Sequence, residues 1–336
     1  MHEREAWRDH GQLPNFQEKF WAIWQNGRQK PLDFSEVVDL TRKWTPANGL
    51  LVGEPGRNNF VPPISVKSLE AVALASVARY FRALVFLWSI CALVILSVGV
   101  INLSSKAVLT GLLFGSVALV LFLDFHFSLR VNRGVEERAL YFHWMKKSGS
   151  FARKGGAFWI YSVLFLAVTQ ILLIQKHESL TAVFHAYGVM YSDVRAGEIW
   201  RLVTGPYFHY STLHFLINSS MLLVVGPIAF SSFGWFSVFM FTAGNIASAA
   251  AQMWLGGAAF DSFGGISGGV YSLFGGLLAV GFRRRELLPS GLPLLFMGLS
   301  VVGIVSAEVF SEKSATSAHV VGLWVGIVLG LLNLFF

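Results

Sequence analysis

The sequence has little charge and almost no cysteine. Only 13% of its 336 residues are charged, whereas 54% are hydrophobic and the mean hydropathy is +0.57. The chain as a whole is therefore not a soluble globular protein, because soluble domains carry about 25% charged residues. The one cysteine, Cys91, lies inside an apolar run, which excludes a disulfide framework and a cysteine-based metal site. The composition predicts an all-α membrane protein and indicates no bound metal or cofactor.

We also expect no signal peptide, because residues 1–80 are polar and the first long apolar run begins near Ala83. We therefore expect the N-terminus to remain in the cytoplasm. The net charge of +7 fits either nucleic-acid binding or basic cytoplasmic loops. Because Lys and Arg of membrane proteins gather in cytoplasmic loops, we favour the loops and expect no nucleic-acid partner.

Polar and apolar segments divide the chain into four regions. Residues 1–80 mix aromatic and charged residues, which predicts a small helical cytosolic domain that Pro62 and Pro63 separate from a helix starting near Ser68. Residues 81–126 hold two apolar runs, at about 83–103 and 107–125, which predict an extra transmembrane hairpin. A basic cytoplasmic loop at 127–156 precedes the last region, residues 157–336.

Six more spans are expected in this last region, at about 158–174, 211–230, 236–255, 266–282, 292–310 and 315–334. The segment 175–208 is too polar to span and is expected to be an external loop in the membrane interface. The basic loop and the cluster Arg283–Arg285 both fall on the cytoplasmic side of this arrangement. We therefore expect a multi-pass protein of the plasma membrane, which is the inner membrane in a bacterium.

The octapeptide Gly264–Tyr271 places Ser267 among glycines, at the start of an apolar run that continues to Phe282. One interpretation is helix packing, because small residues at spacings of three and four let membrane helices approach closely. The other is a nucleophile, with glycines that allow a substrate backbone to come near Ser267. The motif alone leaves both interpretations open.

Other polar side chains share the depth of Ser267. The helix from Ser267 to Arg283 has a length of about 24 Å at 1.5 Å per residue, so Ser267 lies in the outer third of the membrane. His319, His214 and Asn218 also lie near the outer ends of their helices. Ionisable groups inside a membrane are costly and are usually functional, which favours a site in this layer.

Ser267 and His319 supply a nucleophile and a general base, the minimum for acyl transfer. The only carboxylates near their helices are Glu308 and Glu312 at a loop edge, so we predict a dyad without an orienting acid. Tyr271 follows Ser267 by one helical turn and can stack on the imidazole.

His214 and Asn218 project from one helix face, since they are four residues apart. They form either two donors aimed at an oxyanion or a hydrogen-bonded pair that joins helices. The spacing alone leaves both possibilities open.

Taken together, these residues resemble the rhomboid family of intramembrane serine proteases over roughly 157–336. The matching elements, in the family's order, are Gly197–Arg201, Thr204, Phe208–His209, His214 with Asn218, Gly265–Gly268 with Tyr271, and Ala318–His319 with Gly322 and Gly326. The extra hairpin and the N-terminal domain lie outside the resemblance. Thr316 and Ser317 depart from the more usual Asn-Gly before the histidine.

The resemblance implies a six-helix rhomboid bundle that acts as an intramembrane serine endopeptidase, with Ser267 as nucleophile and His319 as general base. It implies an oxyanion hole of His214, Asn218 and the backbone N–H of Ser267, with Tyr271 packed on His319. The supporting residues that it implies are Gly265, Gly268, His209, Trp200 and Arg201. Substrates would be transmembrane proteins, cleaved near the outer ends of their helices.

Two other functions are alternatives. A catalytically inactive rhomboid relative would bind membrane helices, but such relatives usually lack the serine or the histidine, and this chain has both. A transporter or channel would carry charges deeper in the bundle and repeat symmetry between its halves, and we find neither in the sequence.

Overall fold

The computed structural model describes residues 19–24, 28–57, 59–130, 132–147, 151–255, 261–284, 287–310 and 315–333. Residues 1–18 of the predicted N-terminal domain, as well as Arg285 and Glu312, lie outside these described residues. The chain divides into two compact units. One comprises Met1–Arg153 with Arg284–Leu299, and the other comprises Lys154–Arg283 with Ser300–Phe336.

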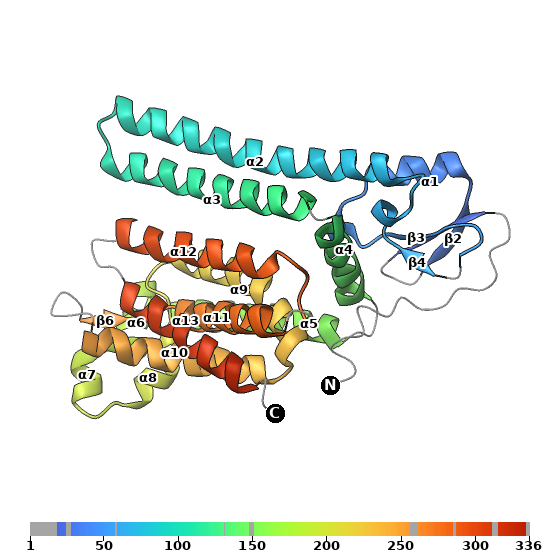
Figure 1. Ribbon diagram of the computed structural model, residues 1–336. Helices are drawn as coiled ribbons and strands as arrows, with labels where there is room; N and C mark the ends of the chain where they lie inside the picture. The colour runs from blue at the N-terminus through green and yellow to red at the C-terminus, as the bar shows by residue number, and fades with distance from the viewer. Residues whose placement is uncertain are drawn as a thin grey trace. The chain divides into compact units, whose positions relative to one another are not determined.

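The N-terminal region contains a small antiparallel sheet, so the prediction of a helical domain is wrong (Figure 1). The strands are β1 (Phe20–Ile23), β2 (Gln29–Leu32), β3 (Leu51–Gly53) and β4 (Phe60–Val61), in the order β2-β1-β3-β4. Helix α1 (Phe34–Thr41) follows β2, and a capping box of Asp33 and Glu36 fixes its start. Aromatic or β-branched residues occur in β1, β3 and β4, but the strands are too short to reveal alternation in the sequence.

This sheet shares one hydrophobic core with the helices that follow it. Trp44 and Val52 are fully buried together with Val77 of α2 (Glu70–Ile101) and Ala139 of α4 (Asn132–Lys146). The buried guanidinium of Arg138 in α4 forms a bidentate pair with Asp124 of α3 (Ser105–Arg130), at 2.5 and 2.8 Å. Pro62 and Pro63 are buried in this unit and precede α2, which begins at Glu70, two residues after the expected start near Ser68.

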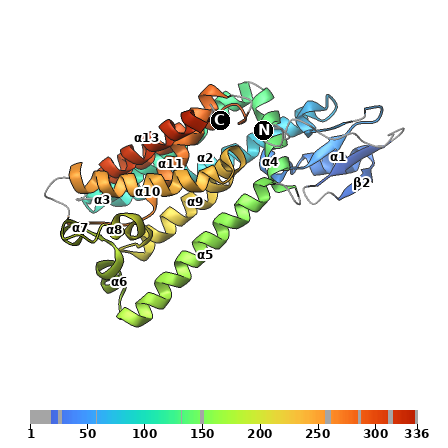
Figure 2. The ribbon, with the colours of Figure 1, turned by 90° about the horizontal axis from the view of Figure 1, so that it is seen from below.

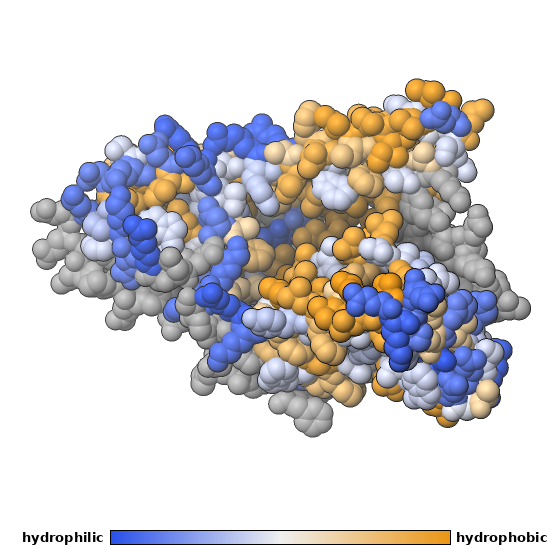
Figure 3. Space-filling model, turned by 180° about the vertical axis from the view of Figure 1, so that it is seen from behind, coloured by the Kyte–Doolittle hydropathy of each residue, from blue (hydrophilic) through white to orange (hydrophobic). Residues whose placement is uncertain are grey.

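Helices α2 and α3 form the predicted hairpin. Helix α2 is continuous from Glu70, so the predicted juxtamembrane helix and the first span are one element. Gly99 and Gly111 allow the two helices to approach closely, since a Cβ at either position would lie within 3 Å of backbone atoms of the other helix. Apolar residues cover the hairpin and polar residues gather over the sheet region (Figure 3).

The second unit is a helical bundle (Figure 2). Its helices are α5 (Phe151–His177), α9 (Thr212–Phe233), α10 (Phe236–Leu255), α11 (Ser267–Arg283), the second half of α12 (Leu292–Phe310) and α13 (Thr316–Asn333). Helix α11 is buried at every residue from Ser267 to Gly281. It is therefore the central helix, as expected of a helix that is apolar all round.

All eight predicted spans correspond to helices. Five described helices are long and apolar enough to cross a membrane: Glu70–Ile101, Ala107–Phe127, Arg153–His177, Thr212–Phe233 and Thr316–Asn333. A shorter apolar helix covers Leu292–Val305. The chain is thus a multi-pass integral membrane protein.

The segment between α5 and α9 contains only short elements. They are α6 (Leu180–Tyr187), β5 (Val189–Met190), α7 (Tyr191–Arg195), α8 (Trp200–Thr204) and a 3₁₀ turn, Gly205–Tyr207. Strand β5 pairs with β6 (Ser262–Phe263), which lies just before Ser267 in the chain. The segment thereby fixes the loop that leads into α11.

Candidate active site

A tight turn leads into the helix that carries Ser267. Gly265 has a φ of +105°, in the left-handed region that favours glycine. A Cβ at this position would overlap the His214 ring and would lie 3.0 Å from Nδ2 of Asn218. The turn therefore needs glycine for its backbone conformation, and also for the approach of α9 to the start of α11.

Glycines bring α11 and α13 together along their length. A Cβ at Gly322 would overlap the carbonyl oxygen of Gly268, and one at Gly326 would overlap that of Ser272. Gly330 lies against Gly276 in the same way, because a Cβ added at Gly330 would lie only 2.9 Å from the Cα of Gly276. The α13 glycines therefore serve helix packing, and this packing brings the helix that carries His319 close to the helix that carries Ser267.

Ser267 and His319 are within hydrogen-bonding distance. Ser267 Oγ lies 3.0 Å from His319 Nε2, and the two residues are 5% and 9% exposed. His319 Nδ1 has no hydrogen-bond partner among the described residues. The side chains of Glu308 and Glu312 lie outside the described part of the structure. The pair can exchange a proton, and its burial shields the hydroxyl from bulk water.

Tyr271 stacks on His319. The two ring centroids are 4.6 Å apart and the ring planes are inclined by 28°. Tyr271 is 3% exposed, and its hydroxyl lies against Gly303 of α12, where a Cβ would overlap it. The Tyr271 ring thus fixes one face of the imidazole, and among the described residues no carboxylate bonds to His319 Nδ1.

His214 and Asn218 contact each other in α9. Asn218 Nδ2 lies 3.0 Å from His214 Nε2, so the bond joins two residues of one helix and does not connect helices. Of the two possibilities that the spacing left open, a bond that joins helices does not describe this contact. The amide group has a second N–H that this bond does not use.

His209 packs behind this pair. Its ring meets that of His214 edge to face, with centroids 5.3 Å apart, and it is fully buried. Burial, and then the neighbouring His214, lower the pKa of His209 to about 3. His209 is therefore neutral at physiological pH and fills space beside His214.

Helix α10 supplies three polar side chains that the sequence analysis did not identify. Asn245 Oδ1 accepts a bond from the N–H of Gly269 at 2.7 Å, and Gln252 Oε1 accepts one from the N–H of Ala318 at 3.3 Å. Ser248 Oγ donates to the carbonyl of Ala318 at 2.7 Å. The first turns of the helices that carry Ser267 and His319 are thereby both capped by α10.

Gln252 also explains one departure from the family pattern. Ser317 Oγ donates to Gln252 Oε1 at 2.6 Å, two residues before His319. The serine therefore helps to hold the start of α13 in place. The spacing of Asn245, Ser248 and Gln252 could have indicated this polar face, since residues three, four and seven apart share one side of a helix.

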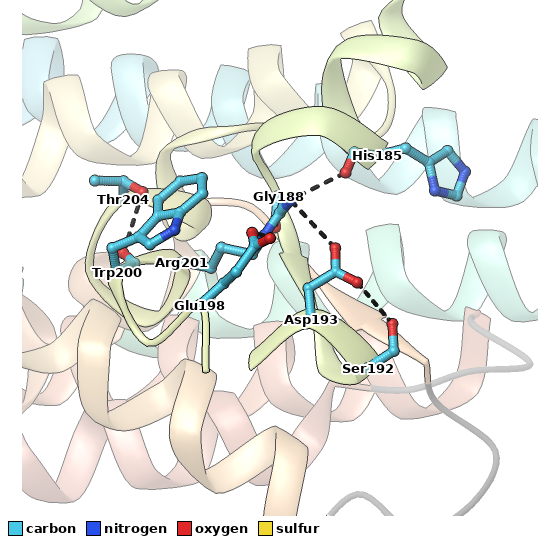
Figure 4. A network of polar contacts seen from close by, with 8 residues as sticks. All are labelled: His185, Gly188, Ser192, Asp193, Glu198, Trp200, Arg201 and Thr204. Atoms are coloured by element: carbon cyan, nitrogen blue, oxygen red, sulfur yellow. Dashed lines mark hydrogen bonds and ion pairs between the residues drawn. The ribbon is translucent and has the colours of Figure 1, made fainter. Parts of the chain in front are cut away.

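Arg201 binds the short elements of the interfacial segment together (Figure 4). The guanidinium is 6% exposed and donates to Glu198 at 2.6 Å and to the carbonyl of Gly188 at 2.9 Å. It also pairs with Asp193 at 3.1 Å and lies 4.9 Å from the centroid of the Trp200 ring. None of these contacts involves Ser267 or His319, so Arg201 holds the short elements of this segment together without touching the pair.

Arg201→Lys is expected to destabilise the fold by about 1–3 kcal/mol, because a lysine cannot reproduce the planar set of donors. Thermal unfolding in detergent micelles measures this loss. Arg195→Lys is the matched control, since Arg195 is exposed in the same segment. Equal unfolding temperatures for Arg201→Lys and the wild type would contradict the structural role of Arg201.

Groups of three or more His, Cys, Asp or Glu side chains that could hold a metal ion do not occur in the described part of the chain. The polar groups around Ser267 are hydroxyl, imidazole and amide groups, which suit proton transfer and hydrogen bonding to an oxyanion.

Comparison with known proteins identifies this bundle. The family model of the Rhomboid domain matches residues 196–335. A protein of Yersinia pestis (strain Pestoides F) named Rhomboid protease GlpG is 32% identical over 146 residues, which are 41% of this chain and 50% of the relative. The protein of the same name from Haemophilus influenzae is 29% identical over 140 residues, covering 40% of this chain and 70% of the relative.

The chain therefore spans about half the length of the Yersinia relatives that it matches. The matched region includes the candidate site residues from Gly197 to Gly326, all of which lie in or beside the helical bundle. Residues 196–335 thus match the Rhomboid domain, and in this region the chain is similar to proteins named as rhomboid proteases.

Proposed function

We propose that this protein is an intramembrane serine endopeptidase that cleaves transmembrane helices of other membrane proteins. The observation that carries the proposal is the 3.0 Å separation of Ser267 Oγ and His319 Nε2, two side chains from different helices. A hydroxyl and an imidazole at this distance are a nucleophile and its general base. Relatives named as rhomboid proteases support the same activity.

The reaction proceeds in two acyl-transfer steps. Ser267 Oγ attacks the carbonyl carbon of the scissile peptide while His319 Nε2 takes the hydroxyl proton. The C–N bond then breaks, and His319 returns the proton to the leaving amine. A water molecule attacks the resulting ester with His319 again as base, which releases the new carboxylate and restores Ser267.

Asn218 is the proposed side-chain donor to the oxyanion, together with the backbone N–H of Ser267. In the arrangement described above, His214 Nε2 is the acceptor for one amide N–H of Asn218. We therefore assign His214 to the oxyanion pocket as the residue that orients Asn218. The second amide N–H of Asn218 is the one that binds the developing negative charge.

Asn218→Ala is expected to reduce kcat by about 10²- to 10³-fold, the usual effect of removing one oxyanion donor. The KM should change little, because the lost bond forms only in the transition state. Steady-state cleavage of a single-span substrate in detergent or vesicles measures both constants. A large rise in KM at unchanged kcat would contradict the oxyanion role and indicate a part in substrate binding.

The depth of the Ser267–His319 pair in the membrane determines which part of a substrate is cleaved and from which side water enters. With the basic segment 127–156 in the cytoplasm, Ser267 faces the outer side of the plasma membrane, and water enters from there. A transmembrane helix has all of its backbone amides bonded internally, so the scissile segment has to unwind before attack. Helix-breaking residues near the outer end of a substrate should therefore promote cleavage.

Reconstitution of the purified chain with two single-span substrates tests the proposal. One substrate carries a Gly-Pro-containing segment near its outer end, and the other is an uninterrupted leucine helix. We expect internal cleavage of the first substrate only, detected by mass spectrometry of the fragments. Failure to cleave either substrate by a folded protein would instead support the inactive relative that binds membrane helices.

A further inference from the structure

The extra hairpin has a cavity of its own, outside the rhomboid domain. It has a volume of about 680 Å³, within the range of sites for small ligands. Its walls come from one side of α2 and from the facing part of α3, and include Arg82, Val85, Phe86, Ser89, Phe122 and Phe125. The cavity is thus an apolar groove with a single cation at its edge.

Arg82 lies at the boundary between water and the membrane. The α2 segment after it, from Ala83 to Ile101, contains no charged residue, whereas Arg79 lies one helical turn before it. Nε of Arg82 donates to the carbonyl of Ala78 at 3.1 Å, and among the described residues no carboxylate pairs with Arg82. On the facing helix α3, Asp124 is bound by Arg138 at 2.5 Å. Among the described residues, Arg82 therefore has no carboxylate partner.

Snorkelling alone would also place an arginine at this boundary. It would not require an apolar cavity beside the guanidinium, with two exposed phenylalanine rings on its walls. Phe86 and Phe122 are 65% and 48% exposed, so their rings are available to hydrocarbon chains. The charge and the cavity together match one kind of molecule, an anionic head group joined to an acyl chain.

We propose that this groove binds a single anionic phospholipid, with its phosphate at Arg82 and an acyl chain along Val85, Ser89 and Phe122. Basic pockets between transmembrane helices select anionic head groups. A second basic residue near the membrane surface adds to the attraction. Arg79 supplies that second positive charge. The site is independent of the proposed protease chemistry, since none of its residues belongs to the rhomboid domain.

Native mass spectrometry of the full-length protein tests the site with phosphatidylglycerol and phosphatidylcholine of identical acyl chains. We expect one phosphatidylglycerol adduct that is preferred over phosphatidylcholine. Arg82→Gln should weaken this adduct about fivefold, the effect of one basic residue near a membrane surface. Arg283→Gln is the matched control, since it removes an exposed arginine at the end of a different helix, α11, and should leave the adduct unchanged.

A second pair of variants tests the cavity without altering charge. Ser89→Phe fills the groove and should weaken binding of phosphatidylglycerol, whereas Ser97→Phe places the same ring on an exposed position of α2 and should not. Thermal unfolding of each variant verifies that it is folded. Equal losses in Arg82→Gln and Arg283→Gln, or equal binding of both lipids by the wild type, would overturn the proposal.

Discussion

Ser267→Ala and His319→Ala are each expected to reduce substrate cleavage by about 10⁴- to 10⁶-fold, the scale on which members of a nucleophile–base unit act. Without Ser267 no acyl-enzyme can form, and without His319 no group remains to take the hydroxyl proton. The double variant should be no less active than either single variant, since the two residues act as one unit. Initial rates of cleavage of a single-span substrate in vesicles measure all three variants.

Both substitutions should leave the bundle folded. Ser267→Ala removes one hydrogen bond and should shift the unfolding temperature little, whereas His319→Ala also removes the buried ring that stacks on Tyr271 and should lower it more. Tyr271→Phe is the matched control. It keeps the ring that stacks on His319, with centroids 4.6 Å apart, so both its unfolding temperature and its cleavage rate should stay close to those of the wild type. Full turnover by His319→Ala would show that another group is the general base.

Gly326→Ala is expected to disrupt both stability and activity, although it adds a single methyl group. The Cβ would overlap the backbone carbonyl of Ser272, so α13 has to move away from α11. Overpacking of this kind costs about 1–3 kcal/mol. Because His319 lies on α13, a displacement of about 1 Å also separates it from Ser267, which can reduce the rate about 10²-fold. Thermal unfolding and cleavage rates in the same detergent measure the two effects.

Gly156→Ala is the control for this substitution. Gly156 lies in α5, and a Cβ there would meet only Pro227 at 3.9 Å, an ordinary contact. Both variants gain the same helix propensity, about 1 kcal/mol. Only Gly326→Ala should lose activity. Wild-type cleavage by Gly326→Ala would show that α11 and α13 do not need their close approach to align the pair.

The membrane helices were predictable because their ends are marked in the sequence. The predicted spans 236–255 and 292–310 coincide with α10 and α12, which begin after turns at Gly234 and Gly291. The N-terminal sheet was not predictable from local pattern. Its strands have two to four residues, and β1 pairs with β3 across an intervening helix, which no short window of sequence contains.

The candidate site was predictable where residue chemistry is unusual for a membrane span. Ser267, His319, His214 and Asn218 stand out as polar groups in apolar runs, and the family resemblance gave them roles. Asn245, Ser248 and Gln252 were missed because uncharged polar residues in a helix have many possible partners. Their function depends on which backbone groups they meet, the N–H of Gly269 and the N–H and C=O of Ala318.

Reaction of the folded protein with a fluorophosphonate, followed by peptide mapping, tests the central claim most directly. Such a reagent forms a covalent bond only with a serine whose proton is removed by a nearby base. We expect the adduct on Ser267 alone in the wild type, and no adduct in either His319→Ala or Ser267→Ala. An unlabelled wild-type protein, or unchanged labelling of Ser267 in His319→Ala, would contradict the claim that these two side chains form the catalytic pair.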